Sequence, residues 1–221
     1  MSAATVGEFV RMWIDGWVVS RGASDPLVEP WGWTIDVGQA EHVSRHLLPE
    51  PTETEVRKLV AATSAPGTWL KLFADDDTVR SWVTPDWRLD APAFLMTCPL
   101  GAERVELPAG YRCTSWTRGD VIRVLIRTTD GQFAARGQLA VAGAVGVPDQ
   151  IETAAAHRRK GLGSVVMRTL QHAAHQAGAD TGVLVATSAG QALYSTLGWT
   201  TRSPMASLCY APPVAPPVAA S

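Results

Sequence analysis

The segment His157-Arg158-Arg159-Lys160-Gly161-Leu162-Gly163-Ser164 lies between a predicted strand and the longest predicted helix of the chain. Its two glycines let the backbone turn tightly and approach a ligand closely. The helix that follows would offer the unpaired N–H groups of its first turn and the positive end of its dipole. With three basic side chains at the same place, the segment predicts a binding site for an anion such as a pyrophosphate.

The surroundings of this segment narrow the choice of ligand. Residues 144–153 are predicted as a strand, 163–177 as a helix with one apolar stripe, 181–187 as a strand and 190–197 as a helix. The sequence contains neither the G-x-x-x-x-G-K-[ST] phosphate loop nor a G-x-G-x-x-G after a strand, which disfavours nucleoside triphosphates and dinucleotides. A solvated helix start is the alternative interpretation of the basic residues.

Two motifs together resemble one known family. The run from Arg158 to Gly163 matches the R/Q-x-x-G-x-G/A signature of the GNAT acetyltransferases, and residues 192–199, Ala-Leu-Tyr-Ser-Thr-Leu-Gly-Trp, resemble that family's A-L-Y-x-x-L-G-F/W segment. The resemblance covers roughly the second half of the chain. It implies an α+β fold (mixed α/β) with a central, mostly antiparallel sheet flanked by helices, and it implies acetyl-CoA as the cofactor.

The resemblance also implies a role for each site residue. Ile151, Glu152 and Thr153 would end the fourth strand of the fold, where the sheet splays and the pantetheine arm can hydrogen-bond to the backbone. The segment Arg158–Ser164 would hold the phosphates. Thr187, where relatives often carry asparagine, would bond the pantetheine or the backbone. Tyr194 would lie near the sulfur and give a proton to the departing thiolate; a half-buried structural tyrosine is the alternative.

The general base is an open question in the sequence. Many relatives carry a glutamate where this chain has Val147. Asp149 lies two residues further on, so it projects to the same strand face and is the first candidate. Glu152 is predicted to point to the other face and is the second candidate. Either carboxylate could instead pair with an arginine, Arg136 or Arg158, and a water relay is a third route.

Three regions are predicted along the chain. Residues 1–100 form a Trp-rich α/β region, 101–210 the acetyltransferase domain, and 211–221 an extended proline-rich tail. In the first region, a helix is predicted over 6–19, a loop over 21–33, and a solvated surface at Arg45-His46. The segments 79–96 and 194–208 share an order of short helix, turn, tryptophan and strand, which indicates either a shortened copy of the second half or chance similarity.

Composition excludes several functions. A formal net charge of −2 gives no basic stripe for nucleic acid, and no apolar run is long enough to span a bilayer. Three cysteines without C-x-x-C spacing predict reduced thiols and no metal site. Composition thus predicts a cytoplasmic protein, and the resemblance implies a monomer or homodimer that acetylates a primary amine of a small molecule. A protein acetyltransferase and a non-catalytic acyl-CoA-binding module are the alternatives.

Overall fold

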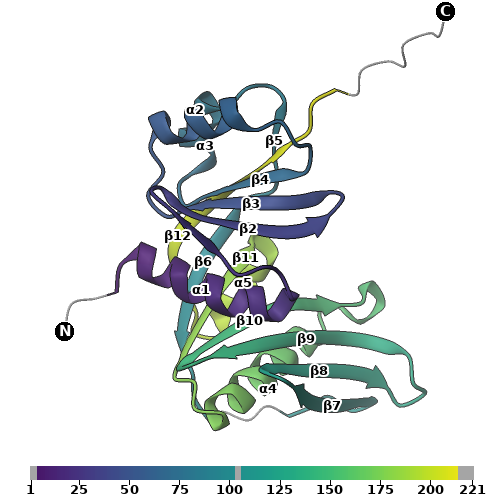
Figure 1. Cartoon of the computed structure of the whole chain (residues 1–221). Coiled ribbons are helices and arrows are strands. Elements are labelled where there is room, and N and C mark those ends of the chain that lie inside the picture. Colours follow the sequence, from purple (N-terminus) through teal and green to yellow (C-terminus); the bar gives the residue numbers. More distant parts are fainter. Residues whose placement is uncertain (1–3, 103–105, 214–221) are drawn as a thin grey trace, which may run out of the picture. The chain divides into compact units, whose positions relative to one another are not determined.

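The computed structural model describes residues 4–102 and 106–213. The chain forms two compact units, each made from two separate stretches of sequence (Figure 1). The major unit comprises the chain up to Ala23 together with Phe94–Ser203, and the minor unit comprises Ser24–Ala93 together with the chain from Pro204 onward. These boundaries differ from the predicted division at residue 100, because the N-terminal helix packs on the major unit's sheet while the last strand pairs within the minor unit. Residues 214–221 of the predicted tail lie outside the described residues.

The major unit is built on a mostly antiparallel sheet with the strand order β6-β11-β10-β9-β8-β7. Strands β7 to β10 are successive antiparallel neighbours, whereas β10 and β11 are parallel. The strands are β6 (Ala93–Pro99), β7 (Tyr111–Arg118), β8 (Val121–Thr128), β9 (Phe133–Ala142), β10 (Val145–Thr153) and β11 (Thr181–Thr187). The helices are α1 (Val6–Arg21), η2 (Ala155–His157), α4 (Leu162–Gln176) and α5 (Ser188–Thr196).

Helices α1 and α4 cover opposite faces of this sheet (Figure 1). The side chain of Gln138 on β9 donates to Ser20 of α1, while the adjacent Gly137 is so close to α4 that an added Cβ would lie 2.6 Å from Cγ1 of Val166. Successive strand residues point to opposite faces, so the two helices are on different sides. Helix α1 begins with a capping box between Thr5 and Glu8. No helix among the described residues is long and apolar enough to cross a membrane.

The minor unit has a sheet of order β1-β2-β3-β4-β12, with β5 also paired to β12. Val56 of α2 packs on Leu48, Leu70 and Leu72 and closes the core on one face of this sheet. The strands are β1 (Leu27–Glu29), β2 (Gly32–Gln39), β3 (His42–Leu48), β4 (Thr68–Leu72), β5 (Trp87–Leu89) and β12 (Thr200–Tyr210), which starts in the major unit. The helices are α2 (Glu53–Ala62), α3 (Asp76–Val79) and η1 (Arg80–Trp82).

The two halves of the chain repeat one order of elements. In each half an antiparallel pair leads into a helix, a parallel strand and a second helix, as β2-β3-α2-β4-α3 and as β9-β10-α4-β11-α5. The strand that ends each half lies in the other unit. Strand β6 of the first half neighbours β11, and β12 of the second half pairs with β4 from Ala206↔Leu72 to Cys209↔Trp69.

Two predictions for the first half are wrong. The predicted loop 21–33 contains the strand β1, which pairs with β2 from Leu27↔Thr34 onward. The predicted solvated surface at Arg45-His46 is part of strand β3, where Arg45 is buried and His46 is half-buried. The guanidinium of Arg45 donates to the His42 ring at 3.0 Å. This hydrogen bond offsets part of the cost of burying the charge.

Candidate active site

Strands β10 and β11 separate shortly after they begin. Their parallel pairing is confined to Val145↔Thr181 and Gly146↔Gly182, although β10 continues to Thr153 and β11 to Thr187. Pro148 follows just after the last pair and has no N–H to donate to a neighbouring strand. The result is the splayed opening predicted at the end of β10.

A β-bulge lies at the mouth of this opening. Asp149 pairs with Gln138 and Glu152 with Arg136, so two residues of β10, Gln150 and Ile151, stand opposite the single residue Gly137. Gln150 has a left-handed backbone with φ 54°, which is unusual for a side-chain-bearing residue.

The predicted orientation of Glu152 is wrong because of this bulge. Residues paired across a ladder share a face, and Arg136 and Gln138 alternate with Gly137 on β9. Glu152 therefore lies on the same face as Asp149, the face of α1, and not on the opposite one. Ile151 instead packs toward α4, where an added Cβ on Gly137 would come within 2.5 Å of its Cδ1.

The basic segment before α4, predicted as an anion site, leads into an uncapped helix start. Gly161 is the N-cap, with φ 78° and no side-chain cap for the helix. Arg159 also has a left-handed backbone, with φ 61°. Arg158, Arg159 and Lys160 are all exposed. The first turn of α4 thus presents backbone N–H groups and three cations to the same solvent-accessible place.

Gly163 brings this turn close to α5. A Cβ at Gly163 would lie 2.9 Å from Cδ2 of Leu193 and 3.9 Å from Oγ1 of Thr153. The start of α4, the end of β10 and α5 therefore border one region. The segment Arg158–Ser164 and the strand end Ile151–Thr153 meet as the sequence predicts.

Tyr194 lies on α5 in the core beneath this region. It is 8% exposed and packs with Met96, Met167, Leu184 and Trp199. Burial, and secondarily the negative charge of Asp149, raises the pKa of Tyr194 to about 12. The hydroxyl has no hydrogen-bond partner among the described residues. A protonated, unengaged phenol suits a proton donor.

Asp149 is held by the C-terminal end of α1. Its carboxylate accepts from Ser20 Oγ at 3.0 Å and from Arg21 Nη2 at 2.9 Å. Gln138 donates to Ser20 Oγ at 2.8 Å and so fixes that hydroxyl. The side chain of Asp149 is 13% exposed, so it is largely but not fully shielded from solvent. The sequence carries no local signal that links α1 to β10. It therefore does not predict that Asp149 contacts Ser20 and Arg21, or that Gln138 supports Ser20.

Glu152 and position 147 are less suited than Asp149 to the role of general base. Glu152 accepts from Arg136 at 2.9 Å, and both side chains are about half exposed. Val147 is fully buried, and a Cβ on Gly16 of α1 would lie 2.3 Å from its Cγ2. A carboxylate at position 147 would be buried against α1, which gives a physical reason for the apolar residue there.

Thr187 is the N-cap of α5. Its hydroxyl oxygen accepts from the backbone N–H of Gly190 at 3.2 Å. This contact uses the hydroxyl oxygen of Thr187 and leaves its proton free to be donated elsewhere.

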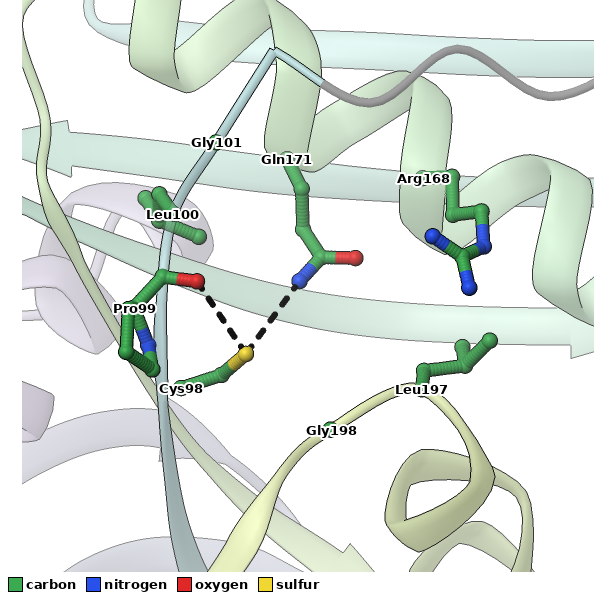
Figure 2. Close-up of a pocket in the computed structure, with 8 residues that line it drawn as sticks. All are labelled: Cys98, Pro99, Leu100, Gly101, Arg168, Gln171, Leu197 and Gly198. Atoms are coloured by element: carbon green, nitrogen blue, oxygen red, sulfur yellow. Dashed lines mark hydrogen bonds between the residues drawn. The ribbon is translucent and has the colours of Figure 1, made fainter.

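A separate pocket of about 350 Å³ lies on the flank of this region (Figure 2). Arg168 and Gln171 extend toward it from α4, and Leu197 and Gly198 border it after α5. Gln171 Nε2 donates to the Cys98 sulfur at 3.8 Å, and burial raises the pKa of that thiol. Cys98 is therefore a protonated, structural thiol, and like Cys113 and Cys209 it is free.

Comparisons with known proteins identify the fold. No family model and no curated protein matches the chain. A GCN5-related N-acetyltransferase from Kribbella flavida superposes with a TM-score of 0.70 at 18% identity, over 96% of this chain and 98% of that one. One from Sphaerobacter thermophilus superposes with a TM-score of 0.55 at 11% identity, over 82% and 78%. A tandem GNAT protein from the clavulanic acid biosynthesis pathway gives a TM-score of 0.52 at 10% identity, over 71% and 68%. The chain therefore has the fold of the GCN5-related N-acetyltransferases, the GNAT superfamily.

Proposed function

We propose that this protein is an N-acetyltransferase that transfers the acetyl group of acetyl-CoA directly to a primary amine of a small molecule. The observation that carries the proposal is the meeting of three features in the major unit. They are the splayed end of β10, the basic glycine-rich start of α4 and the protonated phenol of Tyr194.

The residues fit coenzyme A. The uncapped first turn of α4, from Leu162 to Ser164, offers N–H groups for the pyrophosphate, and the exposed cations Arg158, Arg159 and Lys160 supply its counter-charge. The backbone from Ile151 to Thr153 has lost its pairing with β11 and can hydrogen-bond the amides of a pantetheine arm.

The minor unit does not fit the same ligand. Strands β3 and β4 stay paired at every position from Ser44↔Thr68 to Leu48↔Leu72, so no splayed opening forms between them. The first turn of α2 carries Glu53 and Glu55 in place of glycines and cations. Carboxylates there repel phosphate. We therefore expect one acetyl-CoA per chain.

The chemistry divides between two groups of the protein. Acetyl-CoA supplies an acyl group activated as a thioester. As the C–N bond to the amine forms and the C–S bond breaks, Tyr194 would give its phenolic proton to the sulfur that leaves. Asp149 would take the proton lost by the amine, directly or through a water, and the position of its carboxylate on the strand that borders the opening supports this role.

The surroundings of Asp149 favour a small acceptor. Helix α1 covers this face of β10 at Gly16 and again at Ser20 and Arg21. A face confined in this way suits a small amine better than a protein segment.

Calorimetric titration with acetyl-CoA tests the proposal first. We expect one site per chain, low-micromolar affinity or better, and weaker binding at high salt. Arg158→Gln combined with Lys160→Gln should weaken binding at least tenfold, since a charge-assisted hydrogen bond contributes about 1.5–3 kcal/mol. Lys58→Gln combined with Arg88→Gln, two exposed changes in the minor unit, is the charge-matched control. Absence of binding would reject the acetyltransferase.

The second step is a panel of primary amines assayed by release of the coenzyme A thiol. Turnover that needs both acetyl-CoA and a small amine supports the proposal. Tight binding with no turnover on any amine would leave an acyl-CoA-binding module, and turnover confined to peptide lysines or N-termini would leave a protein acetyltransferase.

A further inference from the structure

The minor unit contains a pocket that the proposed reaction does not use. Its volume is about 420 Å³, and it lies between the sheet and the C-terminal end of α2. Glu29, Trp31, Thr34 and His46 line the sheet side, and the chain from Ala62 to Ala65 lines the helix side. All of these residues belong to the minor unit, so the pocket is complete within it.

The pocket is electrically negative. Glu29 is half-buried and forms no salt bridge among the described residues; its contact is a hydrogen bond from Thr34 at 3.4 Å. Helix α2 has no basic residue in its last turn, so the negative end of its dipole at Ala62 and Thr63 has no local counter-charge. No lysine or arginine lines the pocket.

His46 adds a hydrogen-bond acceptor. Burial lowers the pKa of His46, against the opposing effect of Glu29 and Asp36, so the ring is neutral at neutral pH. The Thr34 hydroxyl donates to the Glu29 carboxylate, which can only accept, and lies 2.9 Å from Nδ1 of His46. Nδ1–H is then the donor to that hydroxyl, and Nε2 is left as the unprotonated nitrogen. Nε2 has no hydrogen-bond partner among the described residues.

Trp31 completes the wall with an aromatic surface. Its ring stands at 85° to the His46 ring with centroids 5.3 Å apart. An indole beside an unpaired carboxylate is a favourable place for an organic cation.

We infer that this pocket of the minor unit binds the ammonium group of a small primary amine, at a site separate from the splayed opening of the major unit. The carboxylate of Glu29 supplies the counter-charge, and the carbonyls at the end of α2 and Nε2 of His46 accept the three N–H bonds. Trp31 packs on the carbon chain of the ligand. The abundance of acceptors selects a primary ammonium over a quaternary one, which cannot donate and needs a cage of several rings. The absence of cations in the lining excludes a carboxylate ligand.

The test uses the full chain and follows the His46 ring by NMR, with its Cε1–H signal assigned as the one missing in His46→Gln. The probes are propylammonium, 1-propanol, propionate and tetramethylammonium. Propylammonium should shift the His46 signal saturably, and the other three should shift it weakly and without saturation. Glu29→Gln should weaken the propylammonium response at least tenfold, whereas Glu41→Gln, an exposed change in the same unit, should leave it unchanged.

Three results would overturn the assignment. They are equal, linear shifts for all four probes, a saturable shift strongest with tetramethylammonium, and a propylammonium response that Glu29→Gln leaves intact. The readout does not depend on acetyl transfer, so failure here and failure of the proposed function are separate outcomes. Thermal unfolding of Glu29→Gln checks that the variant is folded.

Discussion

The carboxylate of Asp149 forms a two-point ion pair with the guanidinium of Arg21, which lies 128 positions earlier in the chain. The pair joins the end of α1 to β10 at the mouth of the splayed opening. The carboxylate of Asp149 therefore has two separable roles. It anchors the end of α1 through Arg21, and it would accept a proton from the amine.

Two substitutions separate these roles. Asp149→Asn should lower kcat by about 10²–10⁴ if the carboxylate is the base, with the affinity for acetyl-CoA nearly unchanged. Arg21→Met breaks the same ion pair but keeps the carboxylate, so it should retain most of kcat. Steady-state kinetics and calorimetry on both variants make the measurement. Equal losses of kcat in the two variants would assign Asp149 to anchoring alone. Glu152→Gln is the control, because it removes a carboxylate of the same strand from an exposed ion pair, the one with Arg136.

Tyr194→Phe tests the proton donor. Because the phenol has a pKa of about 12, it stays protonated through neutral and mildly alkaline pH, and kcat should not fall there through its ionisation. The variant should lose about 10²–10⁴ in kcat and bind acetyl-CoA as the wild type does. Ultraviolet titration should show one tyrosine that ionises near pH 12 and is absent from Tyr194→Phe. Unchanged turnover in the variant would remove Tyr194 from the reaction.

Gly16→Ala tests the close approach of α1 to β10. Alanine favours a helix over glycine by up to about 1 kcal/mol, but the new Cβ would lie 2.3 Å from Cγ2 of Val147. Overpacking costs about 1–3 kcal/mol, so the free energy of unfolding should fall by about 1–2 kcal/mol. Urea unfolding measures this loss. Adding Val147→Ala should make the double variant more stable than the two single changes predict; simple additivity would show that the two residues do not meet.

Lys71 should make the minor unit more stable as pH rises. Burial, and then the nearby Arg45, lowers the pKa of Lys71 from 10.5 to about 7. Between these values the unfolded chain binds the extra proton, so the free energy of unfolding rises with pH across this window, by about 1.4 kcal/mol per unit at most. Lys71→Met removes this cost and should stabilise the protein at pH 7, by an amount that shrinks toward pH 10. Urea unfolding at several pH values checks this, with the exposed Lys58→Met as control; a pH-independent difference would contradict it.

Local signals were enough to predict much of the major unit. The glycines at 161 and 163 set the turn, the apolar stripe of α4 set the helix, and the spacing from Tyr194 to Gly198 placed α5. The Asp130-Gly131 pair is likewise a local hairpin signal between β8 and β9, and Gly131 has the left-handed φ of 94° that such a turn needs. In each case the determining residues are neighbours in sequence.

What could not be predicted depends on partners far away in the chain. The orientation of Glu152 is set by a bulge that needs Gly137 on the adjacent strand. Strand β3 was missed because Arg45 and His46 look like surface residues until His42 and Thr34 supply their contacts. The anchoring of Asp149 by Arg21 depends on tertiary packing that no periodicity reveals.

The exchange of final strands also sets an order of assembly during synthesis. Residues 24–93 of the minor unit are made before strands β7 to β11, but β12, the strand that pairs with β4, is made after all of them. Until it arrives, that edge of β4 is unpaired and open to other chains. The major unit receives β6 before most of its own sheet is translated, so it can close first. A nascent chain stopped before Pro204 would thus carry a finished major unit beside a minor unit one strand short.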